Sequence, residues 1–152
     1  MGMYTELVLG VKLLKKTPPK VIEALKFMTG DADEGQYEGN WCPDIDDPLF
    51  SLPRWRFMLR CGSYYFPGQP DSKLIEDTVV CIGEYWLNVR SNFKNYDGEI
   101  NQFLKWLAPY VEQDGNSGFS GYYRYEESEE PTLIYFKSGA FKTRVIAEPE
   151  EA

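Results

Sequence analysis

The sequence predicts an α+β fold, with an antiparallel or mixed sheet of about five to seven strands and two helices on one face. Several segments alternate apolar and polar side chains with a period of two, which is typical of half-buried strands. Two other segments carry apolar side chains at helical spacing. Aromatic residues make up 16% of the chain, and such large flat side chains favour sheet surfaces.

The clearest segment begins with an alternating pattern over residues 85–90, which predicts a strand. Apolar side chains then follow helical spacing over residues 100–111. Asn95 or Asp97 can cap the start of this helix with a side-chain oxygen. Pro109 lacks an amide hydrogen and should end or kink the helix just before it.

The N-terminal part has the same order of patterns. Residues 6–14 alternate and predict a strand. Thr17 followed by Pro18 reads as a helix N-cap and first turn, and Gly30 as the C-terminal stop. At one constant offset this strand and helix superpose on the later pair, and residues 54–60 fall on part of the predicted strand 132–137. A duplicated βαββ unit would explain this internal repeat of the pattern, and so would chance.

The remaining predicted strands are short and separated by turn residues. They cover residues 54–60, 62–66, 78–82, 119–126, 132–137 and 141–146. Residues 69–77 read as a polar connection. All of these elements belong to one predicted domain over residues 1–147, followed by an acidic tail over 148–152.

Residues 31–53 are predicted to form a long acidic surface loop, because they lack periodicity and carry no basic side chain. Long loops in compact domains are often functional. Its acids include Asp33, Glu34, Asp44, Asp46 and Asp47. Hard-cation binding is one use of such acids. A solvated acidic loop is the alternative that we favour, so no metal site is predicted.

Charge and composition argue against several functions. The formal net charge is −8, which repels nucleic acid on average, so no direct nucleic-acid binding is predicted. There is no histidine, which removes the commonest general base, and no catalytic residue or cofactor is predicted. Three cysteines without CxxC spacing and a start without a signal-peptide pattern predict a cytoplasmic protein that does not enter a membrane.

Two groups of side chains are candidates for binding. The predicted anion-binding residues are Arg54, Arg56, Arg60, Arg90 and Arg124, with Tyr64, Tyr65, Tyr122, Tyr123 and Tyr125 around them. Cross-strand pairing with surface glutamates is the alternative for these arginines. The predicted partner-binding residues are Asp33, Glu34, Trp41, Asp44, Asp46, Asp47, Phe50, Trp106 and Tyr110. Covering of the core is the alternative for the aromatics.

Four segments of the chain are similar in sequence to a known group of proteins: MGMYTELVLG, LKKTPPKVIEALKFMTG, YWLNVRSNFKNYDGEINQFLKWLAPY and GFSGYYRYEESEEPTLIYF. In these segments the chain resembles small uncharacterised proteins encoded by tailed phages and prophages. The resemblance implies a bacterial cytoplasm as the setting, and it implies no reaction, cofactor or site.

Together these observations predict a non-enzymatic acidic interaction protein, a phage or prophage accessory factor that binds a host protein. The alternative is a small-molecule or anion-binding module that uses an Arg/Tyr face of the sheet. An enzyme with two converging carboxylates, or with Cys42 beside a base, is a third hypothesis.

Overall fold

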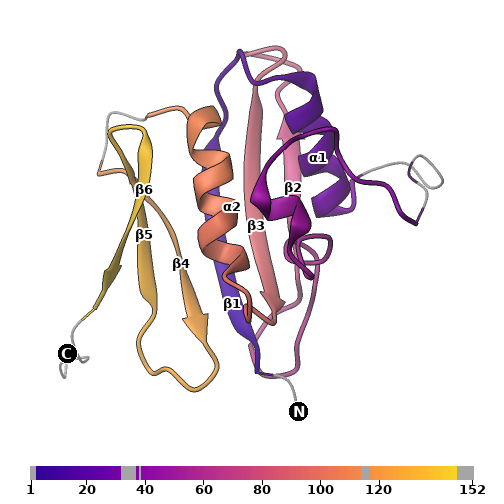
Figure 1. The fold of residues 1–152 in the computed structure, drawn as a ribbon. Helices are drawn as coiled ribbons and strands as arrows, with labels where there is room; N and C mark the ends of the chain where they lie inside the picture. The colour runs from indigo at the N-terminus through magenta and orange to yellow at the C-terminus, as the bar shows by residue number, and fades with distance from the viewer. Residues whose placement is uncertain (1–2, 32–36, 38, 114–116, 147–152) are drawn as a thin grey trace.

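A computed structural model describes residues 3–31, 37, 39–113 and 117–146. These residues form one six-stranded sheet with two α-helices and two short 3-10 helices (Figure 1). The strands are β1 Thr5–Lys12, β2 Lys73–Glu76, β3 Tyr85–Phe93, β4 Phe119–Tyr125, β5 Thr132–Lys137 and β6 Ala140–Val145. The helices are α1 Pro19–Thr29 and α2 Glu99–Leu107, and the 3-10 helices are η1 Pro48–Ser51 and η2 Ala108–Tyr110.

The sheet order is β2-β3-β1-β4-β5-β6, and every neighbouring pair is antiparallel. Each α-helix connects two strands that are separated in the sheet by one other strand: β3 lies between β1 and β2, and β1 lies between β3 and β4. This is the split β-α-β arrangement, extended by the β5–β6 hairpin. The predicted α+β class, the strand number and the two helices are therefore confirmed.

The two helices begin and end largely where the sequence predicts. Gly30 closes α1 in the left-handed conformation, with φ of 80°. Thr17 does not cap α1, because its hydroxyl donates to the Leu14 carbonyl and the helix starts at Pro19. Asn95 Oδ1 accepts from the Ile100 amide at the start of α2. The α-helix ends at Leu107, just before the turn that contains Pro109.

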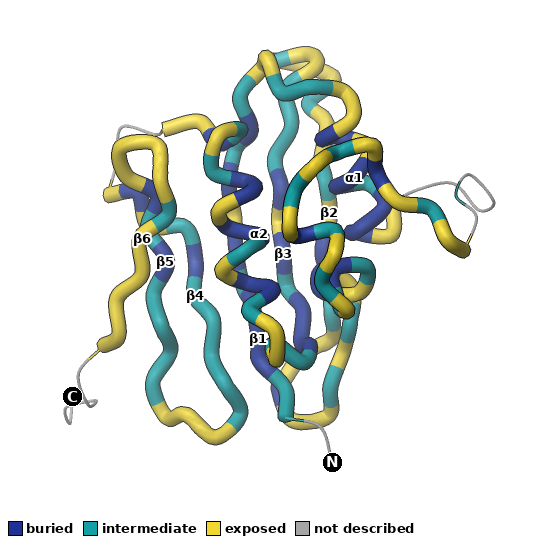
Figure 2. Tube along the Cα trace, in the orientation of Figure 1, coloured by how far each residue is buried: buried dark blue, intermediate teal, exposed yellow. Residues whose placement is uncertain are grey.

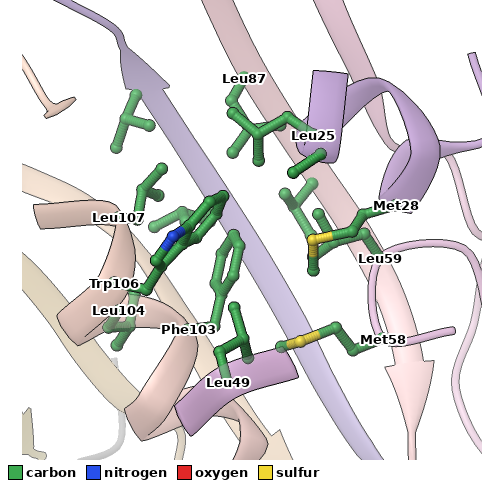
Figure 3. Packing of buried hydrophobic residues seen from close by; sticks show 14 of the residues in the cluster. Leu25, Met28, Leu49, Met58, Leu59, Leu87, Phe103, Leu104, Trp106 and Leu107 are labelled. Atoms are coloured by element: carbon green, nitrogen blue, oxygen red, sulfur yellow. The ribbon is translucent and has the colours of Figure 1, made fainter. Parts of the chain in front are cut away.

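Both helices pack on the same face of the sheet, where the core lies (Figures 1 and 2). The alternation of β1 and β3 decides which side chains enter it: Leu7 and Leu9 of β1 and Leu87 and Val89 of β3 are buried. Figure 3 shows Leu25 and Met28 of α1 and Phe103 and Leu107 of α2 converging on these strands. Burial of these apolar stripes stabilises the layered arrangement.

The prediction of a strand at residues 54–60 is wrong, because this segment folds as consecutive turns. Amides of Phe57 and Arg60 donate to carbonyls three residues earlier. Trp55, Met58 and Leu59 are buried, which is the spacing of a helical turn, whereas Phe57, which an alternating strand would bury with Trp55 and Leu59, is exposed. The first half therefore contains a strand, a helix and a single further strand. The pattern that the two halves share extends only to a β-α-β unit.

The strand pairing with β3 also differs from the prediction. β2 lies at residues 73–76, inside the predicted polar connection, and residues 62–66 and 78–82 form turns. Asp77 explains the second turn, because its carboxylate accepts from the amides of Val79, Val80 and Cys81 at 2.8, 3.1 and 3.0 Å. Those amides are thus bonded within a loop and are not available to a sheet ladder.

Candidate anion-binding site on the open face of the sheet

We call the face of the sheet that lies opposite to the two helices the open face. Strand register places on it Glu6, Val8, Gly10, Lys12, Lys73, Ile75, Trp86, Asn88, Arg90, Asn92, Phe119, Tyr122, Arg124, Leu133, Tyr135, Lys137, Ala140, Lys142 and Arg144. Basic and aromatic side chains dominate this set, and no helix of the described residues covers it. The open face therefore differs in charge from the acidic chain as a whole.

Glu6 lies at the centre of the most polar part of the open face. Its side chain is only 2% exposed. The Tyr122 hydroxyl donates to Glu6 Oε1 at 3.1 Å. Arg90 Nη2 lies 3.5 Å from Oε2, and Arg124 Nη2 lies 3.7 Å from Oε1. Three neighbouring strands thus bring one carboxylate, two guanidinium groups and one phenol together, because Glu6 pairs with Arg124 and Val8 pairs with both Arg90 and Tyr122.

This cluster borders a hollow of about 230 Å³, lined by Glu6, Pro67, Arg90, Tyr122, Arg124 and Pro131. Arg90 Nη2 donates to the Pro67 carbonyl at 2.8 Å. The Arg124 guanidinium lies 5.1 Å from the centre of the buried Phe66 ring. Both guanidinium groups are therefore held by one loop, and proline rings wall the hollow on two sides.

Glu6 does not engage all of the hydrogen-bond donors of the two guanidinium groups. Hydrogen bonds between guanidinium and carboxylate are normally about 2.7–2.9 Å long, so both contacts to Glu6 are long. Arg124 Nε is buried and has no hydrogen-bond partner among the described residues. The side chains of Arg90 and Arg124 are 39% and 34% exposed. One carboxylate faces two cations, so the cluster carries a net positive charge.

Tyr122 is suited to the role of a neutral donor in this cluster. Its pKa lies above the ordinary value of 10.0, first because of burial and then because of the negative charge of Glu6 and the bond to it. The phenol therefore keeps its proton across the physiological pH range. It donates that proton to Glu6 and fixes the position of the carboxylate between the two arginines.

The other predicted arginines do not join this cluster. Arg54 Nη1 lies 2.7 Å from Asp97 and 3.5 Å from Glu99, near the start of α2. The guanidinium groups of Arg56 and Arg60 lie over the Phe27 ring of α1. The prediction of one patch formed by all five arginines is therefore wrong, because residues 54–60 do not form a strand of the sheet. Arg90 and Arg124 alone come together.

The predicted partner-binding aromatics pack against the protein itself. Trp106 is 4% exposed, which contradicts its assignment to an exposed surface. Phe50 contacts both Trp55 and Trp106, and Trp41 contacts Phe27. Tyr110 is half-buried beside Trp106. These side chains close the edge of the core.

The acidic residues in the same prediction have different positions. Asp44 and Asp46 are exposed. Asp47 is half-buried, and its Oδ1 accepts from the Leu49 amide at 2.9 Å and so caps η1. Asp33 and Glu34 lie outside the described residues. Part of the acidic loop therefore has a structural role.

The described residues show no group of three or more His, Cys, Asp or Glu side chains that could hold a metal ion. In this part of the chain, no helix is both long enough and apolar enough to cross a membrane. Glu6 is the functional candidate that sequence reasoning missed. Its polar side chain within the alternating strand 6–14 was the available signal, but its burial depends on contacts with β3 and β4.

The fold and this site define an α+β protein with a split β-α-β sheet and a basic, aromatic open face. Comparisons of the chain with protein-family models, with curated proteins and with solved structures found no match.

Proposed function

We propose that the chain is a non-enzymatic binding protein and that the hollow beside Arg90 and Arg124 binds an anionic group. The observation that carries this proposal is the convergence of two guanidinium groups, from β3 and β4, on one hollow of the open face. Guanidinium groups bind phosphate, sulfate and carboxylate groups through paired N–H donors. The long contacts to Glu6 leave such donors available.

A purely structural role for the cluster is the competing explanation. In that case the arginines only neutralise a buried carboxylate, as buried ion pairs commonly do. The two explanations make different predictions for the wild type. If the cluster binds an anion, the wild type has measurable affinity, and removal of Glu6, which competes with the ligand for the guanidinium groups, increases it. If the cluster is only structural, Glu6 already occupies the guanidinium groups and the wild type has no anion affinity, even if Glu6→Gln gains some.

Titration calorimetry with phosphate, sulfate and acetate tests the proposal on the wild type and three variants. Glu6→Gln removes a negative charge and keeps a similar shape, so affinity should rise about tenfold. Arg124→Gln should lower affinity by a similar factor. Arg60→Gln is the matched control, because Arg60 is exposed and lies over α1; its affinity should equal that of the wild type.

Absence of binding in the wild type would refute the proposal, whether or not Glu6→Gln binds. Equal loss of affinity in Arg60→Gln and Arg124→Gln would also contradict it, because the effect would then follow net charge. A thermal melt of each variant shows whether it is folded, and Arg124→Lys keeps the charge if Arg124→Gln unfolds.

The hypothesis of an acidic docking surface for a host protein has less support from the structure. Its aromatic anchors Trp41, Phe50 and Trp106 pack within the protein. Ile45, between its exposed acids Asp44 and Asp46, packs against the core of the protein. The protein partner, the phage or prophage setting and the cytoplasmic location stay predictions.

A further inference from the structure

We propose that the ligand of the open face is a single-stranded nucleic acid, whose phosphates meet the arginines and lysines and whose bases stack on the exposed ring of Phe119 and the partly exposed rings beside it. This inference rests on the proposed anion binding and names the class of ligand. It concerns the whole open face, of which the hollow beside Arg90 and Arg124 is one end.

The register of the strands arranges the basic side chains in rows. One row crosses five strands in the order Arg90, Val8, Tyr122, Leu133, Arg144. Neighbouring strands lie about 4.8 Å apart, so the row is roughly 19 Å long. A single phosphate or carboxylate occupies only a small part of that length. Cations at both ends of the row suit an extended polyanion.

Aromatic rings on the open face are paired with cations. Lys12 Nζ lies 5.0 Å from the Trp86 ring centre. The Tyr135 ring has Arg144 at 5.4 Å and Lys137 at 5.2 Å. Rings and cations placed side by side are the two elements that single-stranded nucleic acids need, because the bases stack while the backbone is neutralised.

Phe119 adds an accessible stacking surface. Its ring is 51% exposed and lies 5.5 Å from the Tyr135 ring. Beside it is a hollow of about 100 Å³ bordered by Gly10, Lys12 and Phe119, among others. The hollow lies where β1 and β4 separate, since their pairing ends at Leu9 and Gly121. Gly10 has no side chain to fill it. A planar ring that entered here would have Phe119 on one side and, nearby, the Lys12 ammonium, which is paired with the carboxylates of Glu84 and Glu112.

The net charge of −8 does not exclude this ligand, because the charges are unevenly distributed. The carboxylates of Glu6, Glu84 and Glu112 on or beside the open face lie close to Arg or Lys. Many other acids lie in the loop 31–53 and the turn 126–130. No acid among the described residues of the loop 31–53 lines either hollow of the open face, and at the hollow beside Arg90 and Arg124 two cations face the single carboxylate of Glu6.

The shape of this face favours a single strand over a duplex. Proteins read duplex DNA by placing a helix or a two-stranded ribbon into a groove, whereas this face is a wide sheet surface. Its rings reach only bases that are not already stacked in a helix. An acidic peptide is the competing ligand, since it satisfies the cations, but it has no flat bases and does not use the rings.

Fluorescence anisotropy with a labelled oligothymidine of about 12 nucleotides tests the inference, with unlabelled polyphosphate and polyglutamate as competitors. The wild type should bind the oligonucleotide, and binding should weaken as salt rises. The competitors should displace it only at much higher charge concentrations. Phe119→Ala and Tyr135→Leu should each weaken binding about five- to 100-fold, as loss of one stacked base does. Phe57→Ala is the matched control, because Phe57 is exposed and lies outside the sheet.

The outcomes separate this inference from the proposal on which it rests. If inorganic phosphate and polyphosphate bind but the two aromatic variants bind the oligonucleotide like the wild type, the nucleic-acid inference is overturned and anion binding stands. If polyglutamate competes as well as the oligonucleotide, the ligand is an acidic peptide and the inference is overturned. If neither phosphate nor oligonucleotide binds, both proposals fail. Tyr135→Phe keeps a ring and should restore binding.

Discussion

Glu6 and Arg124 face each other across the β1–β4 pair, with Glu6 Oε1 at 3.7 Å from Arg124 Nη2. The carboxylate is nearly inaccessible to water, whereas the guanidinium is partly exposed. Each side chain therefore depends on the other to a different degree. The glutamate needs cationic neighbours in order to stay charged, while the arginine keeps part of its hydration.

This asymmetry predicts that Arg124 contributes to stability mainly through Glu6. Arg124→Ala should lower the free energy of unfolding by about 1–3 kcal/mol, below the loss for a fully buried pair, because Arg90 stays beside Glu6. The double variant Glu6→Gln/Arg124→Ala should lose less than the sum of the two single variants. Urea unfolding measures all four chains. Strict additivity would mean that the two side chains are not coupled.

Gly121 is predicted to tolerate no side chain. It lies at the irregular register between β4 and β5, with φ of 154°, and a Cβ there would collide with the Val8 carbonyl oxygen of β1. Gly121→Ala should lower the free energy of unfolding by about 2–3 kcal/mol. Gly10→Ala is the control, because its Cβ would meet only Asn88 Oδ1 at 3.7 Å. Equal thermal melts for the two variants would contradict the close approach of β4 to β1.

Trp106 is predicted to stabilise the core and to have no role as an exposed anchor. Its indole packs against Phe50 and Phe103 (Figure 3 shows Trp106 and Phe103). Trp106→Ala should cost about 3–5 kcal/mol of unfolding free energy, as is typical for buried aromatics. Tyr110→Ala, at a half-buried position, should cost clearly less. Denaturant titration distinguishes the two variants; a Trp106→Ala protein as stable as the wild type would place this side chain on the surface.

The loop after β2 should weaken in acid. Hydrogen bonds from the amides of Val79, Cys81 and Val80 hold the pKa of the Asp77 carboxyl below its ordinary value of 3.8. A depressed pKa in the folded state means that the carboxylate stabilises the loop above pH 3.8 and loses this contribution as pH falls through the lower, folded-state pKa. Amide hydrogen exchange should therefore show protection of Val79 and Cys81 that decreases in this range.

Asp77→Ala supplies the comparison for that prediction. At neutral pH the variant should exchange these amides faster than the wild type, and the difference should disappear below pH 3.8 as the wild-type carboxyl becomes protonated. Asp71→Ala is a control at an exposed acid outside this loop. A difference between Asp77→Ala and the wild type that stays constant down to the lowest pH would show that the charge of Asp77 does not hold the loop.

Local patterns in the sequence were sufficient to predict the helices and strands that bury one regular row of apolar side chains. The spacing of Ile100, Phe103 and Leu107 predicts α2, and all three side chains are buried. The same reasoning failed at residues 54–60, because Trp55, Phe57 and Leu59 alternate as a strand face would, whereas the buried residues are Trp55, Met58 and Leu59, at the spacing of a helical turn. β2 was missed because four residues at a sheet edge carry too little periodicity.

The candidate site shows a different limit. Arg90 and Arg124 were among the predicted anion-binding residues, but their proximity to each other depends on β1 lying between β3 and β4. Glu6 owes its burial to side chains that are distant in the sequence, such as Tyr122. Strand alternation gives the face of each residue, and only the order of the strands decides which residues become neighbours.

A titration followed by two-dimensional ¹H–¹⁵N NMR tests the central claim most directly, since it observes the Nε–H groups of Arg90 and Arg124 together with every backbone amide. On addition of phosphate or of the oligonucleotide, these two side-chain signals and the amides of β1, β3 and β4 should shift, while those of α1 and α2 should not. Shifts confined to residues 39–60 or to the helices, or no shifts at either arginine, would contradict binding at the open face.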